Sequence, residues 1–131
     1  MGNKKIKGRW LGITDTTALM HGKIYEIEAE EGKFYRVIDE THEDYLYPKR
    51  GFEIVTEEEW DKYQNWKKNL NLKVRFIPET DVLFIKNKIY KVYDIQDGCY
   101  QLLGERDESD SQYSDEELLH FWDSEEFEEV K

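Results

Sequence analysis

Residues 23–27 read Lys-Ile-Tyr-Glu-Ile, and residues 88–92 read Lys-Ile-Tyr-Lys-Val. The two stretches lie 65 positions apart, and both alternate apolar with charged side chains, as a half-buried β-strand does. At the same displacement, Tyr-Arg-Val-Ile at residues 35–38 matches Tyr-Gln-Leu-Leu at residues 100–103 without a gap. Two matches in one register indicate an internal duplication.

The match continues further along the chain at a larger displacement. Residues 45–47 and Phe52 align with residues 120–122 and Phe127, which lie 75 positions further on. The second copy has therefore gained ten residues, and the gain falls in the polar, acidic segment 105–119. A polar insertion between two strands is typical of a surface loop.

Each copy predicts a series of short strands and almost no helix. The strands expected in the first copy cover residues 8–13, 23–29, 33–39, 44–47 and 52–55. Glycine-containing turns separate paired apolar runs, which is typical of hairpins. Because a closed sheet leaves no exposed edge, we expect each copy to form a small β-barrel. The expected core residues are Tyr25, Ile27, Phe34, Val37, Phe52, Ile89, Val92, Tyr100, Leu102 and Phe127.

One helix is expected between the two copies. Thr56 and Glu59 have the spacing of a capping box, which predicts that a helix starts here. The sequence thus divides into a first barrel at residues 1–55, a linker helix at 56–71 and a second barrel at 72–131. The helical segment contains no Gly, Ser or Pro, so we expect it to hold the barrels in a fixed orientation.

The composition excludes several classes of function. The chain of 131 residues has 30 acidic and 19 basic side chains and a net charge of -11, which argues against direct binding to nucleic acid or to an anionic membrane. No apolar run reaches the roughly 18 residues of a spanning helix, so we expect a cytoplasmic protein. Cys99 is the only cysteine, which leaves no internal disulfide.

The sequence holds no recognisable catalytic or cofactor site. The histidines His21, His42 and His120 lie far apart and show no metal-ligand spacing. The glycines stand singly, so no phosphate-binding loop is expected. Cys99 has no neighbouring base that would activate it. We therefore expect a protein that is not an enzyme and that needs no metal and no cofactor.

Four stretches of the first copy carry a family resemblance: Gly-Lys-Ile-Tyr-Glu-Ile at 22–27, Tyr-Arg-Val-Ile-Asp-Glu at 35–40, Asp-Tyr-Leu-Tyr-Pro at 44–48 and Phe-Glu-Ile-Val at 52–55. Through them the first copy resembles small SH3-like barrel proteins of Gram-positive bacteria and their phages. This resemblance implies a mainly β protein made of two tandem SH3-like barrels joined by a linker helix. The Ala-Leu-Tyr-Asp-Tyr signature of proline-binding SH3 domains is not present, so proline-rich ligands are not expected.

Two features mark a candidate binding surface. Twelve acids and a single base, Arg106, lie between Glu105 and Val130, and such a block either stays solvated or presents a phosphate-like array to a basic partner. Aromatic side chains lie at matching positions of both copies, where half of each strand must face away from the core. The candidate partner-binding residues are Tyr45, Tyr47, Asp107, Glu108, Asp110, Asp115, Glu116, Glu117, His120 and Trp122.

Two hypotheses follow from these features. The first is a non-catalytic protein-interaction module, encoded by a phage or prophage, that inhibits a host nucleic-acid-handling or defence enzyme as small acidic anti-restriction and anti-CRISPR proteins do. The alternative is a protein that binds or sequesters a small molecule or nucleotide in the groove between the barrels. An unpaired strand edge or the exposed aromatic side chains could also support a homodimer.

Overall fold

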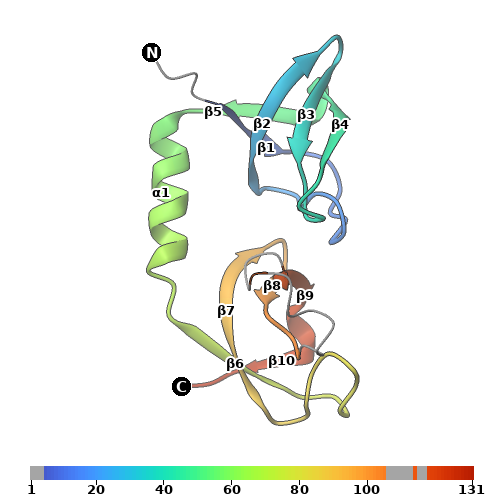
Figure 1. The fold of residues 1–131 in the computed structure, drawn as a ribbon. Coiled ribbons are helices and arrows are strands. Elements are labelled where there is room, and N and C mark those ends of the chain that lie inside the picture. The colour runs from blue at the N-terminus through green and yellow to red at the C-terminus, as the bar shows by residue number, and fades with distance from the viewer. Residues whose placement is uncertain (1–4, 106–113, 115–117) are drawn as a thin grey trace. The chain divides into compact units, whose positions relative to one another are not determined.

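The computed structural model describes residues 5–105, 114 and 118–131. The chain divides into two compact units, Met1–Lys68 and Asn69–Lys131, and each is described here by itself (Figure 1). Both are built around an antiparallel sheet of five strands, and a short helix belongs to the first. The protein is therefore mainly β, as the spacing of apolar residues predicts.

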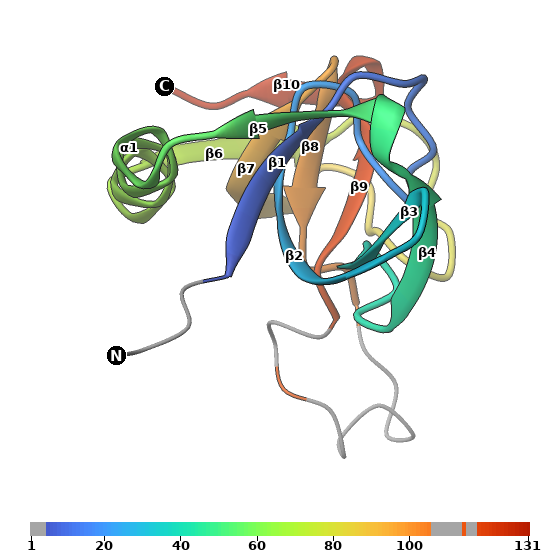
Figure 2. The same ribbon diagram turned by 90° about the horizontal axis from the view of Figure 1, so that it is seen from above.

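The first unit consists of one curled sheet with the helix at its end. Its strands are β1 (Ile6–Trp10), β2 (Ile24–Glu31), β3 (Phe34–Ile38), β4 (Asp44–Pro48) and β5 (Phe52–Val55). They are arranged in the order β4-β3-β2-β1-β5, and a single 3-10 turn, η1 (Lys49–Gly51), precedes the last strand. Figure 2 shows β5 beside β1 and leading into α1 (Glu57–Lys68).

The second unit repeats this arrangement. Its strands are β6 (Leu72–Phe76), β7 (Ile89–Gln96), β8 (Cys99–Leu102), β9 (His120–Asp123) and β10 (Phe127–Glu129), with η4 (Ser124–Glu126) before the last strand. The order β10-β6-β7-β8-β9 matches that of the first unit strand for strand. Even the irregularities agree, because the register between the second and third strands shifts at Ile27/Ala29 in one unit and at Val92/Asp94 in the other.

The interior of each unit is formed by the inward-facing residues of these strands. The prediction of a core position is wrong for Phe34 and Ile89, because these side chains are 43% and 45% exposed. The adjacent residues Tyr35 and Tyr90 are buried instead. Since strand side chains alternate between faces, Phe34 cannot share the inner face with Val37, three positions on. Buried in agreement with expectation are Tyr25, Ile27, Val37, Phe52, Val92, Leu102 and Phe127.

Helix α1 begins as the sequence predicts. The Thr56 hydroxyl accepts a hydrogen bond from the Glu59 amide at 3.1 Å, which is the N-cap contact. The capping box is not completed in the expected way, because the Glu59 carboxylate accepts instead from the Arg9 guanidinium at 3.1 Å. Lys7, on the same strand as Arg9, lies 5.2 Å from the centre of the Trp60 ring. These contacts attach the first turns of α1 to β1.

A tyrosine hydroxyl joins three separate segments of the first unit. Tyr25, on β2, accepts a hydrogen bond from the Met20 amide at 2.6 Å and donates one to Glu40 Oε2 at 2.6 Å. Lys23 Nζ reaches the same carboxylate oxygen at 2.8 Å. The loop before β2, the strand itself and the segment after β3 are therefore held at one buried point.

The second unit contains the same arrangement of a strand tyrosine hydrogen-bonded between a loop amide and a glutamate, which we call the latch. Tyr90 accepts from the Ile85 amide at 2.9 Å and donates to Glu105 Oε2 at 2.7 Å, and Lys88 Nζ lies 2.7 Å from that oxygen. Glu105, the first residue of the segment expected as an insertion, thus occupies the position of Glu40. Burial raises the pKa of Tyr90 to about 12, and the Glu105 carboxylate acts in the same direction.

Removing the hydroxyl of Tyr25 should destabilise the protein more than removing that of Tyr90. Tyr25→Phe leaves Glu40, whose side chain is only 4% exposed, without its hydroxyl donor, and we expect a loss of about 1–3 kcal/mol of unfolding free energy. The side chain of Glu105 is 31% exposed, so water can replace the donor that Tyr90→Phe removes. Urea denaturation of both variants measures the difference, and an equal loss would contradict this account.

The latch also predicts a loss of stability at alkaline pH. An unfolded tyrosine releases its proton near its ordinary pKa of 10.0, whereas folded Tyr90 holds its proton up to about 12. The folded state therefore binds more protons between these values, so its stability is complete below pH 10 and falls as the pH rises towards 12. Urea midpoints measured across this range should fall less steeply for Tyr90→Phe than for the parent protein; identical slopes would show that Tyr90 does not contribute.

Candidate functional site

The first unit has a surface hollow of about 590 Å³ at the end of its sheet. We call it the acidic hollow, because carboxylates make up half of the residues that line it: Glu28, Ile38, His42, Glu43, Asp44 and Tyr45. His42 and Glu43 lie in the connection between β3 and β4, and Ile38, Asp44 and Tyr45 lie at the adjoining ends of these two strands. Glu28 lies at the bulge of β2. The apolar part of the lining is accessible, because Tyr45 is 48% and Ile38 40% exposed.

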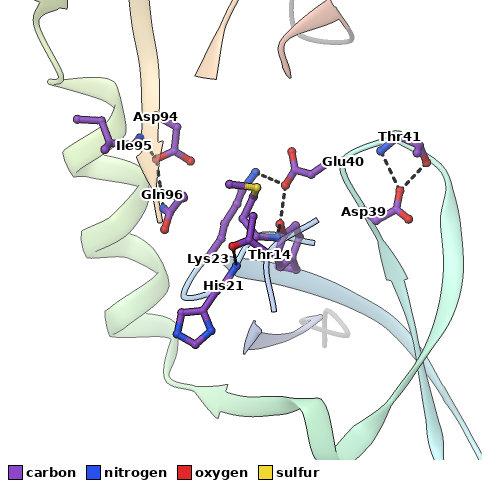
Figure 3. Close-up of polar contacts among 11 residues, drawn as sticks. Thr14, His21, Lys23, Asp39, Glu40, Thr41, Asp94, Ile95 and Gln96 are labelled. Carbon is purple, nitrogen blue, oxygen red and sulfur yellow. Dashed lines mark hydrogen bonds and ion pairs between the residues drawn. The ribbon is translucent and has the colours of Figure 1, made fainter. Parts of the chain in front are cut away.

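Asp39 builds the turn that carries the hollow. Its Oδ1 accepts hydrogen bonds from the amide and the hydroxyl of Thr41, at 2.8 and 2.5 Å (Figure 3). Its Oδ2 accepts a hydrogen bond from the hydroxyl of Tyr47 at 2.5 Å. The Asp39 amide donates a hydrogen bond to the carbonyl of Glu43 at 3.1 Å. A buried carboxylate with three donors is fully satisfied, so the turn has a defined conformation.

The next residue fixes the same connection from its other side. Glu40 is buried, and Figure 3 shows its carboxylate facing Lys23, the contact made by the latch of the first unit. The Glu40 amide also donates to the carbonyl of Ala18 at 2.8 Å, which ties the connection to the loop before β2. Asp39 and Glu40 therefore hold the rim of the hollow in place while His42, Glu43 and Asp44 remain on the outside.

The carboxylates of the hollow differ in how far they are neutralised. Glu28 pairs with Lys5 at 2.7 Å, and Asp44 lies 3.5 Å from Arg36. Within the part of the chain that the structure describes, the Glu43 carboxylate forms no ion pair, and the one hydrogen bond that it accepts comes from the Tyr45 hydroxyl, at 2.9 Å. That hydrogen bond raises the pKa of Tyr45, since the charged Glu43 disfavours a phenolate beside it. The hollow presents a negative surface next to an aromatic ring.

The predicted partner-binding residues fall into three groups. Tyr45 lines the hollow, whereas Tyr47 packs its ring against Trp10, with the centroids 6.1 Å apart, and positions the turn through Asp39. On β9 of the second unit, His120 is exposed and Trp122 packs edge-on against Phe84 at 5.3 Å. The remaining predicted residues lie outside the described residues: Asp107, Glu108, Asp110, Asp115, Glu116 and Glu117.

Sequence reasoning missed most of the lining of the hollow. His42 was considered only as a metal ligand, and Glu28 stood within an expected strand with no sign of its role. Glu28 comes to the site because the register of β2 shifts between Ile27 and Ala29. A hydrophobic pattern does not locate such a bulge, so no signal in the sequence brings Glu28 towards Tyr45.

Among the described residues, the second unit does not repeat the carboxylates of the acidic hollow. At the displacements of the repeat, Glu28 corresponds to Tyr93 and Asp44 to Leu119. Ile38 corresponds to Leu103. The backbone pattern is common to both units, but the carboxylates are not, so the negative surface is not a requirement of the fold.

The described residues show neither a metal-holding cluster nor an activated thiol. They contain no group of three or more His, Cys, Asp or Glu side chains placed to hold a metal ion. Cys99 is half-buried, and burial raises the pKa of its thiol, which disfavours the nucleophilic thiolate. The buried carboxylate of Asp94 accepts from the Ile95 amide at 2.8 Å and from Gln96 Nε2 at 3.3 Å, as Figure 3 also shows.

Comparison with known proteins adds no further constraint. No family model, curated protein or solved structure matches this chain. Within residues 5–105, 114 and 118–131, no helix has the length and apolarity needed to cross a membrane.

Removing the carboxylate of Asp39 should loosen the rim of the hollow. Asp39→Ala leaves the Thr41 amide, the Thr41 hydroxyl and the Tyr47 hydroxyl without their acceptor, at a cost of about 1–3 kcal/mol. Hydrogen exchange at the amides of residues 41 and 43 should accelerate. Glu43→Ala is the matched control, because this exposed side chain should change stability by less than about 0.5 kcal/mol. Equal exchange rates in the two variants would contradict this role of Asp39.

Proposed function

We propose that the chain is a non-catalytic protein-interaction protein built from two tandem SH3-like barrels. The strand order supports this architecture, since each unit has a long loop between its first two strands, a tight hairpin next and a 3-10 turn before its last strand. The helix α1 follows the first of these sheets directly. On this proposal the barrels are scaffolds, and binding is carried by their surfaces.

The acidic hollow carries this proposal. Its carboxylates lie beside the exposed Ile38 and Tyr45, so the surface combines negative charge with apolar area. Lysine and arginine side chains fit such a surface, since their cationic ends pair with carboxylates while their stems pack on aromatic rings. Tyrosine is also frequent among the residues that dominate binding energy at protein interfaces. The partner is thus a protein with an exposed basic segment.

A nucleic-acid-binding enzyme of a bacterial host is the partner class that fits best. Such enzymes carry basic grooves for phosphates, and a chain with a net charge of -11 can occupy them as a competitor. The resemblance to phage proteins supports an origin in a phage or prophage and an anti-defence role of the anti-restriction or anti-CRISPR type. The acids of segment 105–119 add to the negative charge that such a basic groove would attract.

The test is an affinity capture that varies only the charge of the hollow. The intact protein is the bait in lysate of a Gram-positive host, next to the variant Glu28→Gln/Glu43→Gln/Asp44→Asn. We expect the parent to capture a basic nucleic-acid-binding protein that elutes with salt and with duplex DNA, and the variant to retain about tenfold less of it. The control is Glu125→Gln/Glu126→Gln/Glu129→Gln, which removes the same charge from the second unit.

A further variant separates the two acidic surfaces. It replaces the six acids predicted in segment 105–119 by their amides and leaves the hollow intact. Loss of capture in this variant alone would assign binding to the segment and contradict the role of the hollow. Capture that resists salt and persists in all variants would rule out charge as the basis of binding. A rise in melting temperature with a metabolite or nucleotide, and no protein captured, would favour the small-molecule alternative.

A further inference from the structure

The second unit carries a basic face whose cations are only partly paired by the described residues. It consists of the outward-facing residues Lys73 and Arg75 of β6 and Ile89 and Lys91 of β7, and we call it the Lys73 face. Lys73, Ile89 and Lys91 are exposed. Three cations next to an exposed apolar side chain are unusual on a chain whose net charge is -11.

The matching face of the first unit is covered by helix α1. Lys7, the counterpart of Lys73, is only 8% exposed, because its ammonium lies over the Trp60 ring at 5.2 Å and 3.7 Å from Glu57. Arg9, the counterpart of Arg75, contacts both Glu53 at 2.7 Å and Glu59 at 3.1 Å. The first turns of α1 therefore supply two carboxylates and an aromatic ring to the cations of β1.

The second unit has the cations but not these partners. Arg75 has one carboxylate within reach, Glu128 at 3.4 Å, which corresponds to Glu53. Within the described part of the chain, no carboxylate pairs with Lys73 and no ring covers it. Lys73 is exposed, and none of the described residues makes on it the contacts that α1 makes on Lys7.

The cross-strand pairing adds an independent observation. Lys73 lies directly opposite Lys91, so two like charges face each other on the same side of the sheet. At the same place in the first unit, Lys7 lies opposite Glu26, which is a pair of opposite charges. Like charges directly opposite each other destabilise a sheet, so this pair is a cost to the fold that a bound carboxylate would offset.

We propose that the Lys73 face binds an acidic, aromatic helical segment of a partner protein. Its carboxylates would pair with Lys73, Arg75 and Lys91, and its aromatic ring would cover Lys73 and Ile89, as the first turns of α1 do on β1. A nucleic acid fits less well, because the chain as a whole repels phosphates. This surface differs in charge from the acidic hollow, and its test is independent of the function proposed above.

The peptide of residues 56–68, Thr-Glu-Glu-Glu-Trp-Asp-Lys-Tyr-Gln-Asn-Trp-Lys-Lys, serves as the probe. Titrated into the isotopically labelled full chain, it should shift the amide signals of β6 and β7. The charge reversal Lys73→Glu/Arg75→Glu should weaken its binding by about tenfold or more. Lys86→Glu, on the loop of the same unit and paired with Glu79, is the matched control and should bind as the parent does.

A second variant distinguishes lost binding from lost folding. Lys91→Glu creates an opposite-charge pair with Lys73 like that of Lys7 with Glu26, and it removes the contact of Lys91 with the Tyr93 ring at 4.9 Å. The new pair offsets the lost contact, so the variant should melt no lower than the parent while it binds the peptide more weakly. A variant that melts no lower and binds more weakly cannot owe its loss to unfolding. Equal peptide affinity in the parent and Lys91→Glu would overturn the proposal.

Three other outcomes would also overturn it. The peptide could shift only the signals of β1 and β5, which would show that it competes with α1 in the first unit. A DNA duplex could bind the Lys73 face while the peptide does not, which would identify a phosphate site. The protein alone could self-associate in sedimentation experiments and lose this association in Lys73→Glu/Arg75→Glu, which would identify a second copy as the occupant.

Discussion

Each unit depends on one tyrosine hydroxyl that is hydrogen-bonded on both sides. In the first unit, Tyr25 accepts from the Met20 amide and donates to Glu40, and these two partners lie on segments that no strand pairing joins. Burial and the charge of Glu40 both raise the pKa of Tyr25, so the hydroxyl stays protonated and remains a donor above the pH at which an ordinary tyrosine ionises. The loop before β2 and the rim of the acidic hollow are both held by this contact.

The two units share the contacts that hold each sheet and its loops together, but they differ in the charge of their exposed faces. Tyr90 and Glu105 repeat the latch, and Thr80 and Asp81 repeat the loop contacts of Thr14 and Asp15. Within the described ranges the exposed faces differ, since the carboxylates of the acidic hollow are not repeated in the second unit and the Lys73 face lacks the partners that Lys7 has in the first. Two surfaces of opposite charge on one scaffold fit a protein that brings partners together or competes for them.

The fold was largely predictable because its signals are local. Constant displacements of 65 and 75 residues, alternating strands and the Thr56 cap required no knowledge of distant contacts. The predictions of core residues were wrong where a shift of one position changes which face of the strand a side chain lies on. Phe34 and Ile89 were expected in the core, but the adjacent Tyr35 and Tyr90 lie on the inner face. A residue pattern of mixed apolar and aromatic side chains leaves that choice open, and pairing with a neighbouring strand settles it.

The sequence by itself determined the duplication, the mainly β class, the position of the helix and the excess of negative charge, since each is a property of spacing or composition. Only the tertiary structure decided which side chains meet. The bulge in β2 brings Glu28 to the hollow with Tyr45, and the docking of α1 covers Lys7 while Lys73 stays exposed. These contacts join residues far apart along the chain, and their geometry depends on strand register and packing, which no local pattern encodes.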